Sequence, residues 1–192
     1  MTALARDSCA WLQLQPTPLA GLTIVERRLA ADERGWFSRL FCAEELRAAG
    51  IALPVAQINR SLTLRRGAVR GLHYQRPPHA EDKLVTCLRG RVFDVAVDVR
   101  RGSPTFLHWF GIELSADNAM SLLIPPGCAH GFQALEDNCE LLYVHTQPFS
   151  AAAEAGLHAA DPAVGVAWPL QLTQLSSRDA AHPFVTSAFA GI

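Results

Sequence analysis

The stretch Val92-Phe-Asp-Val-Ala-Val-Asp-Val99 decides the fold class, because its residues alternate in type along its whole length. Successive side chains of a β-strand point to opposite faces. The two faces of this segment carry Val95, Val97 and Val99 on one side, and Asp94, Ala96 and Asp98 on the other. The alternation predicts a strand, and the preceding Arg89-Gly90 predicts a tight turn that makes this strand part of a hairpin.

Similar patterns continue on both sides of this strand. Segments at about 106–114, 120–124, 130–135 and 139–147 are bounded by Gly, Pro, Asn or Asp, which commonly end strands. Upstream, Gln57, Asn59 and Ser61 alternate with apolar residues, so these polar side chains share one strand face. A polar face in mid-chain predicts a lined cavity, and the spacing of the strands predicts a mainly β sandwich or barrel of the jelly-roll type.

A few short helices are expected near the edges of this β-rich middle. Residues 43–50 are helix formers that end at Gly50, a common C-terminal stop. The alanine-rich segment 151–160 fits a surface helix or a loop, and Ser176-Ser-Arg-Asp179 fits a last short helix. The sequence contains no repeat, low-complexity segment or linker, so residues 1–192 are predicted to form a single domain.

Composition argues against several classes of protein. The chain has 192 residues, of which 49% are hydrophobic, so it can bury a full core. Its 17 Lys and Arg residues nearly balance 18 Asp and Glu residues, which argues against binding to nucleic acid or to a membrane surface. We expect neither a signal peptide nor a membrane span, because no basic start precedes an apolar segment and no apolar run reaches ~18 residues.

Cysteine usage indicates a reducing compartment. The cysteines are odd in number, scattered, and without a Cys-x-x-Cys pair, which favours free thiols over disulfides or structural zinc. They are Cys9, Cys42, Cys87, Cys128 and Cys139. The expected location is therefore the cytoplasm.

Two motifs place reactive side chains on predicted strands. The first is Arg70-Gly-Leu-His73-Tyr-Gln75, with Lys83 ten residues after its histidine. The second is Pro125-Pro-Gly-Cys-Ala-His130-Gly-Phe132. A base, an acid and fixed positive charge are required to form a carbanion beside a carbonyl, and fixed positive charge also binds pyrophosphate. The two motifs therefore indicate a site that forms a carbanion or a site that binds pyrophosphate.

In these motifs the chain resembles the dTDP-4-dehydrorhamnose 3,5-epimerase family. The resemblance covers residues 32–179 and includes Lys-Leu-Val, Val-Asp-Val-Arg-x-Gly-Ser-Pro-Thr-Phe, Ile-Pro-x-Gly-x-Ala-His-Gly-Phe and a closing Asp-Pro…Trp-Pro. It implies a cupin-type jelly roll (a double-stranded β-helix) and an isomerase that acts on dTDP-4-dehydro-6-deoxyglucose in rhamnose-type deoxysugar biosynthesis. It also implies a homodimer in which an N-terminal strand crosses to the partner, with no metal and no other cofactor.

The same resemblance implies roles for four catalytic residues. His73 is the base, Asp179 the carboxylate on its far nitrogen, Lys83 the charge near the enolate oxygen, and Tyr143 the acid on the opposite face of the sugar. A ketone at C4 activates the hydrogens of both C3 and C5, so one site can invert two centres. Structural alternatives are a turn or helix N-terminal aspartate for Asp179, an exposed strand lysine for Lys83 and a core phenol for Tyr143.

The binding residues are also implied by the resemblance. They are Arg70 for the pyrophosphate, Arg34 and Phe37 of the partner for pyrophosphate and thymine, Gln57, Asn59 and Ser61 around nucleotide and sugar, and His130 near sugar and phosphate. A structural hydrogen bond is an alternative role for Ser61 and His130. No role is assigned to His79, His108, His145, His158 and His182.

Two residues depart from the family pattern. Arg39 stands where the family often has a glutamate, so recognition of the base or local charge pairing is expected to differ. Phe149 stands six residues after Tyr143, beside the expected substrate, where the double epimerases often have a second tyrosine. A phenyl ring donates no proton, so we expect slower inversion at one centre unless a neighbouring group or ordered water replaces the hydroxyl.

Two other functions fit parts of the sequence. A metal-dependent cupin, such as a mononuclear iron dioxygenase, would use His130 together with His73, Gln75 and Glu81. Against this, Gln75 is a weak ligand and Lys83 would repel a divalent cation. A non-catalytic sugar-nucleotide-binding cupin is the third hypothesis, and the presence of His73, Tyr143 and Asp179 argues against it.

Overall fold

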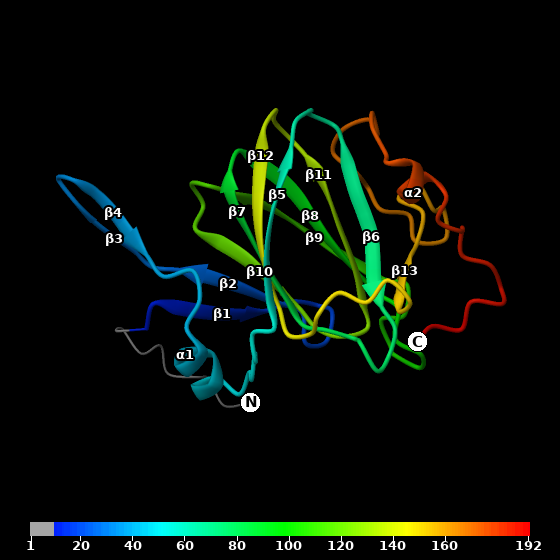
Figure 1. The fold of residues 1–192 in the computed structure, drawn as a ribbon, viewed down its shortest axis with the longest axis horizontal. Helices are drawn as coiled ribbons and strands as arrows, with labels where there is room; N and C mark the ends of the chain where they lie inside the picture. The colour runs from blue at the N-terminus through cyan, green and yellow to red at the C-terminus, as the bar shows by residue number, and fades with distance from the viewer. Residues whose placement is uncertain (1–9) are drawn as a thin grey trace.

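Two antiparallel β-sheets pack face to face and form most of the molecule (Figure 1). The computed structural model describes residues 10–192, so Cys9 lies outside the described part. One sheet has the order β1-β2-β10-β7-β12-β5, formed by β1 (Leu12–Pro16), β2 (Thr23–Arg27), β10 (Met120–Ile124), β7 (Lys83–Arg89), β12 (Cys139–His145) and β5 (Gln57–Thr63). The other has the order β13-β6-β11-β8-β9, formed by β13 (Glu154–Gly156), β6 (Val69–Gln75), β11 (Cys128–Ala134), β8 (Arg91–Asp98) and β9 (Trp109–Ser115). The predicted mainly β jelly roll is confirmed.

The strand that decides the fold is buried on both faces. Val95, Val97 and Val99 of the sequence motif pack in a cluster on the outer face of the five-stranded sheet, beneath the C-terminal segment that includes Trp168. Ala96 faces the core between the two sheets. The predicted alternation is therefore confirmed, and β8 connects two separate apolar clusters.

The predicted hairpin at Arg89-Gly90 is wrong in its pairing. The chain does turn at Gly90, whose φ of +73° suits glycine. However, β7 belongs to the six-stranded sheet, whereas β8 pairs with β9 and β11 in the other sheet. The turn carries the chain across the sandwich, because both strands have an apolar face to bury against the opposite sheet.

Helices and a projecting hairpin complete the fold. α1 (Ala43–Ala48) and α2 (Ser177–Ala180) agree with the expected short helices, and the alanine-rich segment forms turns and β13. A separate hairpin of β3 (Leu29–Asp32) and β4 (Gly35–Ser38) extends away from the sandwich (Figure 1). Within residues 10–192, no helix is long and apolar enough to cross a membrane. The described cysteines are free thiols: Cys42, Cys87, Cys128 and Cys139.

Glycines in the two sequence motifs allow β6 and β11 to approach closely. A Cβ on Gly71 would lie 2.5 Å from the Cα of Gly131, and a Cβ on Gly131 would lie 2.7 Å from the carbonyl oxygen of Arg70. These strands also pair His73 with His130, and the register shifts directly after His130. The motif glycines thus bring two histidine-bearing strands close together.

The Val-Asp-Val-Arg-x-Gly-Ser-Pro-Thr-Phe motif is structural. Asp98 is fully buried and accepts hydrogen bonds from Arg100 Nε at 2.9 Å, Ser103 Oγ at 2.5 Å and Thr105 Oγ1 at 2.6 Å. Burial alone would raise the pKa of Asp98, but these hydrogen bonds outweigh it and hold the pKa below its ordinary value of 3.8. The carboxylate therefore anchors the loop between β8 and β9.

We predict that Asp98→Asn lowers the free energy of unfolding by about 3 kcal/mol, because it leaves a half-buried arginine without its partner. The native contribution is complete above the unfolded pKa and disappears as pH falls through the lower folded pKa, so the variant should also lack this acid-dependent component. Urea unfolding at several pH values measures both effects. Glu113→Gln, which loses an exposed ion pair with Arg91 at 3.5 Å, is the control and should cost less than about 1 kcal/mol. Equal losses in both variants would contradict the assignment.

Candidate active site

A cavity of about 920 Å³ lies between the two sheets and is closed on one side by α2. We call it the main cavity. A side chamber of about 320 Å³ adjoins it, and Asn59, His73, Lys83 and His145 line both spaces. The predicted lined cavity is present: Asn59 and Ser61 line the main cavity, and Gln57 lines the side chamber.

Strand register arranges the cavity-facing side chains of the six-stranded sheet in rows. β12 lies between β5 and β7 and pairs His145 with both Gln57 and Lys83. Two residues earlier on the same strand face, Tyr143 pairs with Asn59. The sheet therefore presents a histidine, a lysine and a tyrosine as close neighbours.

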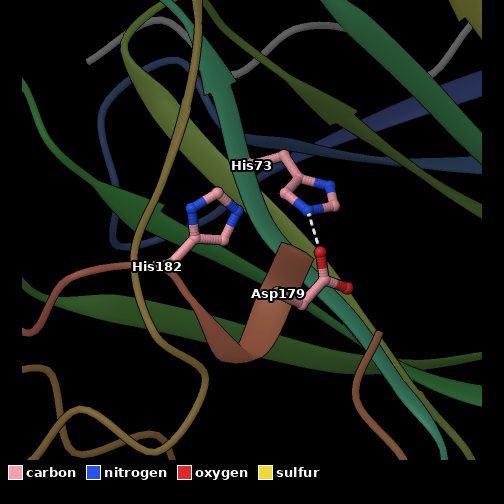
Figure 2. A group of neighbouring side chains, drawn as sticks. All are labelled: His73, Asp179 and His182. Carbon is pink, nitrogen blue, oxygen red and sulfur yellow. Dashed lines mark hydrogen bonds and ion pairs between the residues drawn. The ribbon is translucent and has the colours of Figure 1, made fainter. Parts of the chain in front are cut away.

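The opposite wall holds the His73–Asp179 pair. His73 comes from β6 and Asp179 from α2, and His73 Nε2 lies 2.7 Å from Asp179 Oδ1 (Figure 2). The backbone N–H of Gly71 donates to the other carboxylate oxygen at 3.3 Å, and Ser176 caps α2 by accepting from Asp179 N. The sequence left two interpretations of Asp179 open, a helix N-terminal residue and the carboxylate partner of His73. In the structure Asp179 is both.

Electrostatics keep His73 neutral near pH 7. Burial lowers its pKa below the ordinary 6.5, and the positive charges of Arg178 and Lys83 act in the same direction, whereas Asp179 opposes them. Arg178 Nη2 lies 3.5 Å from His73 Nε2, and Arg178 also bonds Glu154. For Asp179 itself, burial favours a higher pKa, but the hydrogen bonds from His73 and Gly71 lower it overall. The result is a neutral imidazole beside a carboxylate, which can accept a proton.

Lys83 and Tyr143 face this pair from the other sheet. Lys83 comes from β7 and Tyr143 from β12, both strands of the six-stranded sheet, whereas the β6 strand of His73 lies in the opposite sheet. Burial raises the pKa of Tyr143 to about 12, and its hydroxyl lies 3.0 Å from Ser61 Oγ. A phenol with that pKa stays protonated at neutral pH and can act as an acid.

His130 and Arg70 occupy the main cavity as well. His130 Nε2 lies 2.8 Å from Asp94 Oδ1, and both side chains are almost completely buried. Arg70 donates to Thr63 Oγ1 at 3.0 Å and to the carbonyl oxygen of Leu62 at 3.3 Å. His130 therefore has the structural hydrogen bond that its alternative role required, while its ring still lines the cavity.

Four residues expected near the substrate lie outside the main cavity, and one of them, Gln57, lines the side chamber. Arg34 and Phe37 are on the projecting β3–β4 hairpin, where the Arg34 side chain is 84% exposed and paired with Asp32. Phe149 lines the side chamber. The chain's own hairpin thus brings neither Arg34 nor Phe37 into the site described above.

The Arg39 departure has a local explanation. Its guanidinium bonds Glu45, and Glu45 also accepts from the backbone N–H groups of Trp11 and Leu12. Arg39 further lies over the Trp11 ring, 5.3 Å from its centroid. The changed charge is therefore paired within the chain, at the junction of α1 and β1.

Sequence reasoning missed several polar residues around the cavity. His145 Nδ1 lies 2.9 Å from Glu81 Oε2, and Glu81 Oε1 lies 3.4 Å from Lys83 Nζ. His182 stands edge-on to His73 with ring centroids 5.5 Å apart, and its Nε2 is buried without a hydrogen-bond partner among the described residues (Figure 2). Alternation along β12 was a usable signal for His145, because it lies two residues after Tyr143 on the same face.

The donor set of a metal-dependent cupin does not converge. His130 is paired with Asp94, Gln75 donates its amide to the carbonyl oxygens of His79 and Pro148, and Glu81 is shared by His145 and Lys83. His73, Asp179 and His182 do bring possible ligand atoms within 4.8 Å of one another. The guanidinium of Arg178 beside His73 opposes a divalent cation there. The residues present therefore do not fit the iron site of that hypothesis.

The cavity of this jelly roll places a histidine–carboxylate pair opposite a lysine and a protonated tyrosine. A cupin-type epimerase has this architecture. The model of the family described as dTDP-4-dehydrorhamnose 3,5-epimerase matches residues 16–187. The chain belongs to this family, and the predicted resemblance is confirmed.

Individual relatives agree with the family match. The chain is 42% identical over 173 residues to a dTDP-4-dehydrorhamnose 3,5-epimerase of Sinorhizobium fredii, covering 90% of this chain and 89% of the relative. The Bacillus anthracis dTDP-4-dehydrorhamnose 3,5-epimerase structure with TDP and PPi bound has a TM-score of 0.88 and 34% identity, covering 91% of this chain and 99% of that one. A 3'-monoepimerase of Streptomyces bikiniensis in complex with dTDP-quinovose has a TM-score of 0.83 and 35% identity, covering 88% and 86%. The protein is therefore an isomerase.

We predict that the pKa of His73 moves in opposite directions when its two charged neighbours are removed. Arg178→Ala should raise it, because a nearby positive charge disfavours the imidazolium, and Asp179→Asn should lower it. Nuclear magnetic resonance titration of labelled histidine measures both changes, with exposed His108 as an internal reference. Shifts in the same direction in both variants would show that the ion pairs do not control this group.

Proposed function

We propose that this epimerase inverts C3, C5 or both in dTDP-4-dehydro-6-deoxyglucose, by removing a proton beside the C4 ketone, in deoxysugar biosynthesis. The observation that carries the proposal is the His73–Asp179 pair facing Lys83 and Tyr143 across one cavity. A base and an acid on opposite walls are what inversion requires, because the new proton must arrive on the face opposite to the departing one.

The proton on the sugar carbon beside the ketone is transferred to His73. Asp179 holds Nε2, so Nδ1 is the nitrogen that accepts the proton from the sugar. The Asp179 carboxylate then stabilises the imidazolium that forms. The lowered pKa of His73 keeps the ring in its accepting form at neutral pH.

The negative charge moves to the C4 oxygen, where Lys83 stabilises it. The ammonium lies in the buried rim of the side chamber, anchored by Glu81 at 3.4 Å. A fixed positive charge at the developing enolate lowers the barrier most when water is excluded. Tyr143, whose pKa is about 12, then returns a proton to carbon from the other sheet, with Ser61 bonded to its oxygen.

The main cavity also suits the diphosphate of the nucleotide. Arg70 and Arg178 line it and together with Lys83 supply positive charge, while Gln57, Asn59 and Ser61 offer hydrogen bonds along β5. The Bacillus anthracis relative carries TDP and PPi, which supports a thymidine nucleotide ligand here. The free thiols are consistent with action in the cytoplasm.

A second subunit completes the site in this proposal. Arg34 and Phe37 lie on a hairpin that leaves its own sandwich, and the exposed fractions of Trp36 and Phe37 are 62% and 61%. Large apolar side chains on a projecting hairpin are typical of a surface that another chain covers. Each single jelly-roll domain would thus donate its hairpin to the partner, where Arg34 reaches the pyrophosphate and Phe37 stacks on thymine.

We predict that His73→Asn abolishes solvent hydrogen exchange at both C3 and C5 while dTDP binding survives, because both inversions start with the same base. Mass spectrometry and proton spectra of the substrate in heavy water give the exchange at each carbon. His108→Asn, an exposed histidine outside the cavity, serves as the control. Normal exchange at either carbon in the His73 variant would assign the base to another group.

Arg34→Ala should weaken dTDP binding by roughly 1.5–3 kcal/mol, the range for losing a hydrogen bond to a charged group. Calorimetry measures this loss, with exposed Arg101→Ala as the control. Mixing Arg34→Ala and His73→Asn dimers tests the crossing directly. The assay uses a substrate concentration at which the weak binding of Arg34→Ala limits its rate. If the hairpins cross, each mixed dimer regains one site with both residues intact, and activity rises above that of either parent. No gain in activity after verified subunit exchange would place Arg34 in its own chain's site or outside it.

A further inference from the structure

The side chamber contains a histidine–carboxylate pair distinct from His73–Asp179. His145 Nδ1 lies 2.9 Å from Glu81 Oε2, and both side chains are about nine-tenths buried. His145 Nε2 lies 3.4 Å from the Asn59 amide, a long contact that a ligand can replace. Glu81 therefore fixes the ring from one side, while the other ring nitrogen faces the cavity residues.

This pair stands beside the two groups that the proposed reaction uses on the same wall. His145 pairs with Lys83 across neighbouring strands, and its ring stacks on Tyr143 with centroids 6.1 Å apart. All three belong to the sheet opposite His73. A proton from His145 would thus arrive from the same side as one from Tyr143, opposite to the base.

The position of Phe149 shows which proton donor the side chamber lacks. Phe149 lines the side chamber together with His145, Glu81 and Lys83, and its ring offers no proton. The low pKa of Glu81 leaves it ionised near neutrality, since hydrogen bonds from His145 and Lys83 outweigh its burial. Lys83 is committed to the enolate oxygen. On this wall of the side chamber, His145 is the group left to donate a proton.

We propose that His145, oriented by Glu81, protonates the second of the two carbon centres, in place of the hydroxyl that Phe149 lacks. In this step the imidazolium gives its Nε2 proton to the enolate carbon. The enolate electron pair forms the C–H bond, the C4 ketone is restored, and neutral His145 regains a proton from solvent. Tyr143 serves the first centre. The inference rests on the proposed function and extends it to inversion at both carbons.

The test follows deuterium uptake from heavy water at C3 and C5 separately. The native protein should exchange at both carbons. His145→Gln should slow exchange at one carbon by roughly 100-fold, the lower end of the usual effect of a general acid, and leave the other within about twofold. Glu81→Gln should produce a smaller loss at the same carbon. His158→Gln, outside both spaces, is the matched histidine control.

A rescue variant separates a chemical role from a structural one. His145→Gln combined with Phe149→Tyr should recover exchange at the affected carbon, because the tyrosine hydroxyl enters the same chamber. Binding of dTDP, measured by calorimetry, checks that each variant is folded. If His145→Gln does not fold, Glu81→Gln is used instead to test whether exchange is lost at one carbon only.

Three results would overturn the inference: exchange at a single carbon in the native protein, equal loss at both carbons in His145→Gln, or no loss at either. Absence of exchange at both carbons in the native protein would instead reject the proposed function, and the two failures are therefore distinguishable.

Discussion

The bond between His73 and Asp179 is the interaction on which the site depends, because it joins parts of the chain that are 106 residues apart. Asp179 also accepts from Gly71 N, and Ser176 caps the helix that carries it. One carboxylate thus docks α2 on β6, closes the main cavity and orients the His73 ring. The carboxylate oxygens of Asp179 both hold α2 in place and contact the His73 ring. The C-terminal segment therefore cannot shift without changing the proton affinity of His73.

Histidine–carboxylate pairing recurs around the cavity, yet each pair meets different surroundings. His73 is partly exposed beside Arg178, His130 is sealed against Asp94 in the core, and His145 shares Glu81 with Lys83. A carboxylate on one ring nitrogen fixes which nitrogen faces the substrate, whereas access and neighbouring charge decide what that nitrogen can do. The same kind of pair therefore suits a structural support at His130 and, in our proposals, a base at His73 and a second acid at His145.

Much of this arrangement follows from the sequence, and the remainder depends on how strands meet. Alternation in Val92–Val99 predicts β8, and the polar face of Gln57, Asn59 and Ser61 predicts the cavity wall. The crossing at Gly90 was missed because a tight turn looks the same whether its strands pair or enter opposite sheets. The Glu81–His145 contact was missed for a related reason, since it depends on which strand lies beside β12. In our proposal the place of Arg34 depends on a second chain, about which one sequence carries no geometric information.

The position of Asp179 in α2, after the last strand of both sheets, has a consequence for local opening of the molecule. The strands supply His73 and most of the cavity lining, whereas the carboxylate comes from a helix that belongs to neither sheet. A local detachment of α2 opens the cavity and removes the partner of His73 in the same event. Under the proposed mechanism, the opening of this one helix therefore switches off proton transfer without breaking a single pair of strands.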